Sequence, residues 1–118
     1  MRQRIVVADG SPHARLALRL LLEQLPGVAD VAEATTSDAC LATLEHHAAD
    51  VLLLDWRLPG AAADHLLARL RGAHPGLRIV ALSSRPEDGP RALAAGAHAF
   101  VSKADAPEAL LASLPLAD

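Results

Sequence analysis

Residues 51–55 read Val51-Leu52-Leu53-Leu54-Asp55, four bulky apolar residues followed by a carboxylate. An uninterrupted apolar run of this length indicates a strand that is buried on both faces, as in a parallel sheet covered by helices. A carboxylate at the end of such a strand lies where open α/β sheets bind their ligands. The stretch therefore predicts a parallel sheet and a site at its carboxyl edge.

The same pattern recurs along the chain, with helix-like segments between the strands. Apolar runs over residues 5–8, 79–82 and 100–102 lead to Asp9, Ser83 and Lys103, and residues 28–33 form a shorter predicted strand. Right-handed crossovers place helices on both faces of such a sheet. We predict one doubly wound (βα)5 domain of the α/β class over residues 1–118, with a five-stranded parallel sheet in the order 2-1-3-4-5.

Capping and helix-breaking residues bound the predicted helices. Ser11 suits the start of the first helix, and we expect Leu16, Leu20 and Leu21 to form its apolar stripe. Between Ser83 and Gly96, prolines and a glycine restrict the fourth helix. We expect that helix to be short, to start near Asp88 and to end at Gly96.

Composition excludes several classes of protein. The 118 residues are 52% apolar, which excludes disorder, and no apolar run is long enough to span a bilayer. The net charge of −3, without a basic cluster, argues against direct nucleic-acid binding. Residues 1–4 do not resemble a signal peptide, so we expect a cytoplasmic location and no membrane contact. We expect Cys40 to be a small buried residue, and His46 and His47 to be solvated rather than metal ligands.

The polar residues at the strand ends suit phosphoryl chemistry. Two carboxylates in one cleft need a cation between them, and Mg²⁺ prefers oxygen ligands such as Asp9, Asp55 and a loop carbonyl. Asp55 could then act as a nucleophile towards phosphorus. Lys103 and Ser83 would balance the charge of the incoming phosphoryl oxygens. Each residue alone is compatible with ordinary loop chemistry, so the prediction depends on the whole set.

The chain resembles the receiver domains of bacterial two-component response regulators, which have the flavodoxin-like fold of the chemotaxis regulator. The resemblance covers essentially all 118 residues and is carried by residues 5–15 (IVVADGSPHAR), 55–60 (DWRLPG), 81–83 (ALS) and 96–103 (GAHAFVSK). Ala8-Asp9 followed by Pro12, and Lys103 followed by Ala104, are similar to the subfamily whose members usually carry a helix-turn-helix output domain.

This resemblance implies a role for each matching position. It implies that Asp55 is the phosphoacceptor, that Asp9, Asp55 and the Arg57 main-chain carbonyl bind Mg²⁺, that Lys103 contacts the phosphoryl group, and that Ser83 and Phe100 form the switch. It also implies a histidine kinase or phosphotransfer protein as partner, an effector domain or homodimer as output, and no enzymatic role beyond weak self-phosphorylation and autodephosphorylation. Simple core packing remains the alternative for Phe100.

Gly10 departs from the family pattern, which has a second acidic residue at this position. One anionic ligand fewer should weaken Mg²⁺ binding. A degenerate pseudo-receiver, acting as a phosphorylation-independent interaction module, is therefore the alternative function. A phosphatase is disfavoured because no Asp-x-Asp general acid follows Asp55, and a flavin binder is disfavoured because no Ser/Thr-rich phosphate loop is present.

Overall fold

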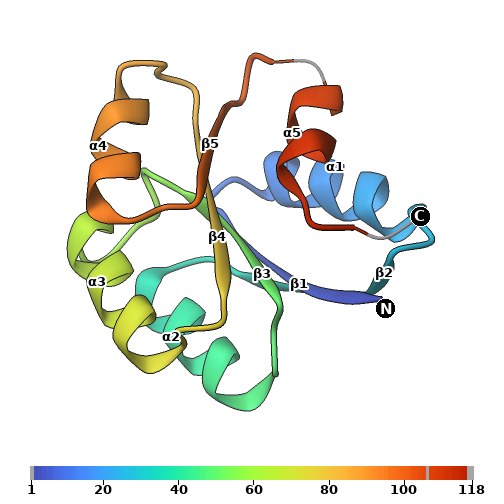
Figure 1. Cartoon of the computed structure of the whole chain (residues 1–118), viewed down its shortest axis with the longest axis horizontal. Helices are drawn as coiled ribbons and strands as arrows, with labels where there is room; N and C mark the ends of the chain where they lie inside the picture. Colours follow the sequence, from blue (N-terminus) through green and yellow to red (C-terminus); the bar gives the residue numbers. More distant parts are fainter. Residues whose placement is uncertain (1, 106, 117–118) are drawn as a thin grey trace.

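The computed structural model describes residues 2–105 and 107–116, in which strands and helices alternate (Figure 1). The strands are β1 (Gln3–Ala8), β2 (Val28–Ala34), β3 (Val51–Asp55), β4 (Arg78–Ser83) and β5 (Ala99–Ser102). The helices are α1 (Pro12–Glu23), α2 (Ser37–His46), α3 (Ala63–Ala73), α4 (Asp88–Ala95) and α5 (Pro107–Ser113). All the predicted strands and helices are present, and only their ends differ from the prediction.

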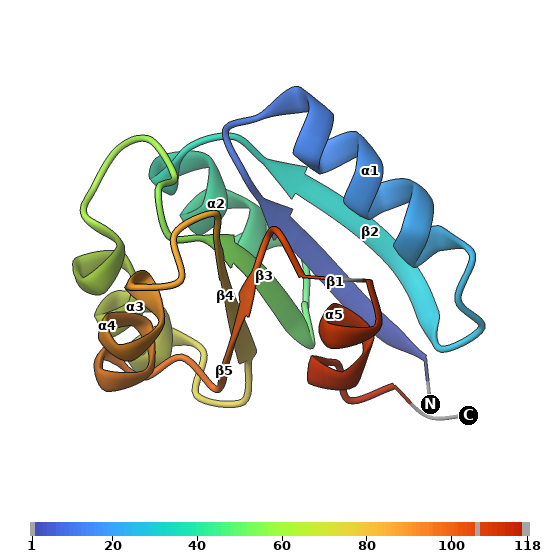
Figure 2. The same cartoon turned by 90° about the horizontal axis from the view of Figure 1, so that it is seen from above.

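The strands form one parallel sheet in the order β2-β1-β3-β4-β5, which confirms the predicted topology. Helices α1 and α5 cover one face, and α2, α3 and α4 cover the other (Figures 1 and 2). Along β3, Leu52 and Leu54 belong to the core beneath α2–α4, whereas Val51 and Leu53 belong to the core beneath α1 and α5. These side chains have no solvent exposure, so β3 is the doubly buried strand that its sequence predicted.

Local signals set the helix ends much as expected. Ser11 caps α1, because its hydroxyl accepts a hydrogen bond from the Ala14 N–H at 3.3 Å. Helix α4 starts at Asp88 and ends at Ala95, and its C-cap Gly96 has a φ of 113°, in the left-handed region that glycine tolerates. The prediction of a short fourth helix is therefore confirmed.

The predicted stripe of α1 was wrong for two of its leucines. Leu16 and Leu20 are 55% and 53% exposed, so they lie on the solvent side of the helix. The buried face is instead formed by Leu22, with Leu18 and Leu21 packed against the same core. Leucines occur on several faces of α1, so its sequence is compatible with more than one apolar stripe.

The expected burial of Cys40 and the expected exposure of His46 and His47 are confirmed. Cys40 is fully buried in α2, and His46 and His47 are exposed near the end of that helix. Within residues 2–105 and 107–116, no three His, Cys, Asp or Glu side chains are grouped closely enough to hold a metal ion. Over the same residues, none of the helices combines the length and the apolar character needed to cross a membrane.

Candidate functional site

The carboxyl ends of β1, β3, β4 and β5 bring the predicted polar residues to one edge of the sheet. Asp55 and Ser83 are the last residues of β3 and β4, while Asp9 and Lys103 directly follow β1 and β5. The Lys103 main-chain N–H donates to the Ser83 carbonyl at 2.8 Å, which fixes β5 against β4 at this point. The strand order therefore gathers these residues as expected.

Lys103 links the two carboxylates. Its Nζ lies 2.6 Å from Asp9 Oδ2 and 3.6 Å from Asp55 Oδ2. Asp9 is fully buried, and its other oxygen accepts a hydrogen bond from the Ser11 N–H at 2.8 Å. The ammonium thus supplies the positive charge that two neighbouring carboxylates require.

The environment of Asp55 disfavours its charged form. Burial is the main cause that raises its pKa, and repulsion from the Asp9 carboxylate adds to it. The Arg57 main-chain N–H, which donates to Asp55 Oδ1 at 3.0 Å, and the Lys103 ammonium act in the opposite direction. Because a raised pKa makes a carboxylate more basic, this environment favours nucleophilic behaviour of Asp55.

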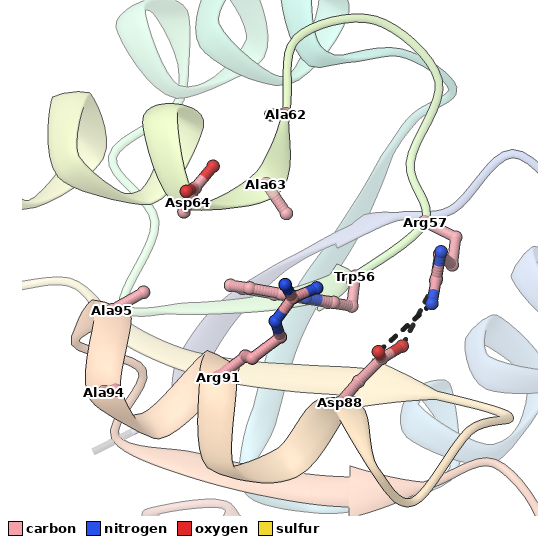
Figure 3. A pocket seen from close by; sticks show the side chains of 9 residues that line it. All are labelled: Trp56, Arg57, Ala62, Ala63, Asp64, Asp88, Arg91, Ala94 and Ala95. Carbon is pink, nitrogen blue, oxygen red and sulfur yellow. Dashed lines mark hydrogen bonds and ion pairs between the residues drawn. The ribbon is translucent and has the colours of Figure 1, made fainter.

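The Ser83 hydroxyl is bonded to α4 and not to Asp55. Ser83 Oγ donates to Asp88 Oδ2 at 2.7 Å and accepts a hydrogen bond from the Arg85 N–H at 3.0 Å. The side chain of Arg57 also donates to Asp88, with Nε at 3.2 Å from Oδ2 and Nη2 at 3.1 Å from Oδ1 (Figure 3). Donation from Ser83 is the main cause that lowers the pKa of Asp88, and Arg57 adds to it against the effect of burial.

Asp88 is a buried polar residue beside the site whose contacts the sequence did not predict. It was expected only as the start of a short helix, and its position five residues after Ser83 gave no sign of a shared hydrogen bond. Asp88 also lines a groove of about 600 Å³ between α3 and α4, together with Trp56, Arg57 and Arg91 (Figure 3). Asp9, Asp55 and Lys103 do not line this groove, so it is adjacent to the acidic site rather than part of it.

Gly10 lies beneath the loop that follows Asp55. A Cβ atom at this position would lie 2.9 Å from Pro59 Cδ, so the ring of Pro59 occupies the space where a side chain would start. The Ser37 N–H donates to the Pro59 carbonyl at 2.9 Å, and Ser37 Oγ accepts from the Ala61 N–H at 2.8 Å. The loop is thereby fixed to α2, over a residue that contributes no carboxylate.

The donors at this edge fit a hard divalent cation, although the set is small. Asp9 and Asp55 offer carboxylate oxygens, and the Arg57 carbonyl belongs to the loop directly after Asp55. No third acidic side chain joins them among residues 2–105 and 107–116. Affinity for such a cation rises with the number of charged ligands, so this donor set is compatible with Mg²⁺ but suits weak binding.

Phe100 packs against the core and against the first turn of α4. The ring is half-buried beside the core beneath α2–α4. A Cβ atom at Gly89 would lie 3.0 Å from Phe100 Cδ2, so the absence of a side chain at Gly89 makes room for the ring. Phe100 therefore contacts the helix that also carries Asp88.

Comparison with known proteins gives a consistent result. The family model of the response regulator receiver domain matches residues 5–115. The chain is 31% identical to the nitrate/nitrite response regulator protein NarL of Escherichia coli, over 93% of this chain and 52% of that protein. It is 36% identical to the transcriptional activator protein ExaE of Pseudomonas putida, over 91% of this chain and 51% of that protein. The chain thus spans about half the length of these relatives.

Solved structures agree with the sequence relatives. RcsB from Salmonella enterica serovar Typhimurium, bound to promoter rprA in the presence of the phosphomimetic BeF₃⁻, gives a TM-score of 0.87 at 25% identity, over 96% of this chain and 58% of that one. A LuxR-family two-component response regulator from Aurantimonas sp. SI85-9A1 gives 0.86 at 27% identity, over 95% of this chain and 81% of that one. The chain belongs to the response regulator receiver domain family.

Proposed function

We propose that residues 1–118 form a receiver domain that accepts a phosphoryl group on Asp55 from a histidine kinase, a phosphotransfer protein or a small phosphodonor. The observation that carries this proposal is the position of the Lys103 ammonium between Asp9 and Asp55 at the carboxyl edge of the sheet. A cation beside a buried carboxylate pair is the arrangement that an incoming phosphoryl group needs.

The transfer requires only a nucleophile and charge stabilisation. Asp55 Oδ1 is held by the Arg57 N–H, so Oδ2, on the Lys103 side, is the oxygen that attacks phosphorus. With acetyl phosphate as donor, a bond forms between Oδ2 and phosphorus, the bond between phosphorus and the acetyl oxygen breaks, and acetate leaves with the electron pair. Lys103 stabilises the charge on the phosphoryl oxygens, and Ser83 donates a hydrogen bond to them in the phosphorylated state.

A Mg²⁺ ion at this site would be held by Asp9, Asp55 and the main-chain carbonyl of Arg57. When bound, it would neutralise negative charge on the phosphoryl oxygens and the carboxylates. Because Gly10 provides no carboxylate, we expect the site to need a higher Mg²⁺ concentration than a site with three acidic ligands.

The output of the domain is proposed from its relatives. Those named above include a transcriptional activator and a nitrate/nitrite response regulator, and the chain matches about half of each. We therefore propose regulation of transcription in the cytoplasm through an effector domain or a homodimer. The receiver domain itself would not bind nucleic acid, and it would act as a phosphoacceptor rather than an enzyme. Ser83 and Phe100 would form its switch, because both contact the first turn of α4.

A phosphorylation-independent interaction module is the second candidate function. It is favoured by one observation, namely that Pro59 occupies the space above Gly10 where a second acidic side chain would start. In this case, the ion pair of Lys103 with Asp9 would only stabilise the fold and would have no role in phosphoryl transfer.

Phosphorylation of the intact chain separates the two candidates. The protein is incubated with acetyl phosphate and Mg²⁺, and its intact mass is measured before and after treatment with hydroxylamine, which cleaves acyl phosphates. Gain of one hydroxylamine-labile phosphoryl group, absent in Asp55→Asn, supports the receiver. If the mass stays unchanged at saturating donor and Mg²⁺, the second candidate is correct.

A further inference from the structure

The hydroxyl of Ser83 is fully committed to partners in the β4–α4 segment. A serine hydroxyl carries one proton, and the proton of Ser83 is donated to Asp88 Oδ2 at 2.7 Å. Ser83 is fully buried, and its oxygen also accepts the Arg85 N–H at 3.0 Å. In this arrangement Ser83 has no proton left to donate to a group attached to Asp55.

Asp88 is unusual for an acidic residue in the first turn of a helix. Asp88 is 3% exposed, and within the described residues its side chain makes no hydrogen bond to the α4 backbone. Both oxygens accept hydrogen bonds from outside the helix. The guanidinium of Arg57, in the loop after β3, donates to both oxygens (Figure 3), and Ser83 on β4 donates to Oδ2. Asp88 therefore connects α4 to two residues that lie next to the acidic site.

We propose that Asp88 is a positioning residue that holds Ser83 in the unphosphorylated arrangement and competes with a phosphoryl group on Asp55 for the Ser83 hydroxyl. This inference rests on the proposed phosphorylation of Asp55. Phosphorylation must then break the bond between Ser83 and Asp88, which works against phosphorylation. Loss of Asp88 should make the phosphorylated state easier to reach.

The same contact connects the site to the surface of α4. Gly89, the next residue after Asp88, lies against the ring of Phe100. When Ser83 turns towards the phosphoryl group, the first turn of α4 loses its bond to β4, and the packing between Gly89 and Phe100 is free to change. Asp88 thus supplies the physical link between the hydroxyl and the aromatic residue of the switch.

Binding of beryllofluoride, a stable phosphoryl analogue, tests this inference on the full chain. The titration contains Mg²⁺ and is followed by the fluorescence of Trp56, the only tryptophan, which is adjacent to Asp55. The variants are Asp88→Ala and Asp88→Asn, with Glu87→Gln as the matched control, because Glu87 is the exposed acidic neighbour of Asp88. Ser83→Ala is measured alone and combined with Asp88→Ala, and circular dichroism verifies the fold of each variant.

We expect Asp88→Ala to bind beryllofluoride about tenfold more tightly than the wild type, as loss of a hydrogen bond to a charged group predicts. Asp88→Asn, which keeps the shape and a neutral acceptor, should show a smaller gain, and Glu87→Gln should show none. In the Ser83→Ala background most of the gain should disappear, because the hydroxyl that Asp88 restrains is absent.

The possible outcomes separate this inference from the proposed function. If the wild type binds and Asp88→Ala binds no more tightly, Asp88 does not restrain Ser83, while the receiver function stands. If Asp88→Ala increases the affinity by the same factor in the Ser83→Ala background, the effect comes from removing a negative charge near the site, and the inference is wrong. If no variant binds beryllofluoride or accepts phosphate from acetyl phosphate, the proposed function fails and the inference fails with it. If Asp88→Ala binds beryllofluoride and the wild type does not, the result supports the inference.

Discussion

Lys103 Nζ lies 2.6 Å from Oδ2 of Asp9, a carboxylate without solvent exposure. Within the described residues, removing the ammonium would leave a buried negative charge with only the Ser11 N–H as partner. Breaking such a pair is more destabilising than the pair is stabilising, because the remaining charge stays desolvated. We therefore expect Lys103 to stabilise the fold, in addition to its proposed role in phosphoryl transfer.

We predict that Lys103→Met lowers the free energy of unfolding at neutral pH by roughly 2–3 kcal/mol. Urea denaturation in the absence of divalent cations measures this change. Arg69→Met is the matched control, because Arg69 is exposed and makes no ion pair in the described part of the chain. Equal stability of the two variants would show that the ion pair of Lys103 with Asp9 does not stabilise the fold.

Asp55→Asn should stabilise the unmodified protein at neutral pH. The folded state raises the pKa of Asp55, mainly through burial, so the folded chain holds this proton more tightly than the unfolded chain does. The stability that this proton contributes is present at low pH and is lost as pH rises through the folded-state pKa. The amide variant avoids that loss and should therefore be more stable than the wild type at pH 7.

Denaturation of the wild type and Asp55→Asn at several pH values checks this prediction. The difference in stability should shrink as pH falls towards about 4, the ordinary pKa of an aspartate. A difference that is constant over the whole range would mean that the effect of the substitution does not come from ionisation of Asp55.

An aspartate introduced at position 10 should destabilise the fold, and so it should not by itself create a strong metal site. In Gly10→Asp, the new Cβ would lie 2.9 Å from Pro59 Cδ, so the loop after β3 must shift. Overpacking of this kind is destabilising by about 1–3 kcal/mol. Gly76→Asp is the control, since a Cβ atom there would meet nothing within 4 Å among the described residues other than its chain neighbours. Similar denaturation midpoints for both variants would show that Pro59 moves freely.

Addition of Mg²⁺ should stabilise the wild type but not Asp9→Asn. At about ten times the dissociation constant, a ligand that binds only the folded state stabilises it by about 1.4 kcal/mol. Thermal unfolding across a Mg²⁺ series measures this effect. In Gly10→Asp combined with Pro59→Ala, saturation should need less Mg²⁺ than in the wild type. An equal response of Asp9→Asn and wild type would place Mg²⁺ elsewhere on the molecule.

The thiol of Cys40 should be inert in the folded protein. Burial raises its pKa to about 11, and the side chain has no solvent exposure. At neutral pH the reactive thiolate is therefore a very small fraction, so labelling by a disulfide reagent requires opening of α2. The labelling rate should rise with denaturant in parallel with unfolding. Complete labelling of the native protein within seconds would contradict the burial of Cys40.

The sequence was sufficient for the architecture because each strand carries its own signal. The apolar run that ends at Asp55 predicts a doubly buried strand, and Gly96 ends α4 as its conformational freedom suggests. The order 2-1-3-4-5, chosen as the common doubly wound order that suits five strands, is confirmed, and it places Asp9, Asp55 and Lys103 together. The buried face of α1 was predicted wrongly, because the leucines of this helix are compatible with more than one apolar stripe.

Side-chain partnerships could not be predicted in the same way. The Ser83 hydroxyl could point towards Asp55, at the end of the neighbouring strand, or towards Asp88, five residues later in the chain. In the structure it donates to Asp88. Sequence spacing does not distinguish these alternatives, because the difference lies in rotamers and in the path of a short loop. The contact of Pro59 with Gly10 is likewise a result of how that loop folds over the site.

The two sides of the acidic site are held by different kinds of bond. The loop on the α2 side is anchored through its own backbone, since Ser37 binds the Pro59 carbonyl and the Ala61 N–H, and a side chain at Gly60 would collide with Ser37. The α4 side is joined to Ser83 and Arg57 through the side chain of Asp88. The α2 side is thus fixed by backbone contacts, whereas the α4 side depends on the side chain of Asp88. We therefore expect a bulky group on Asp55 to displace α4 and not the loop on the α2 side.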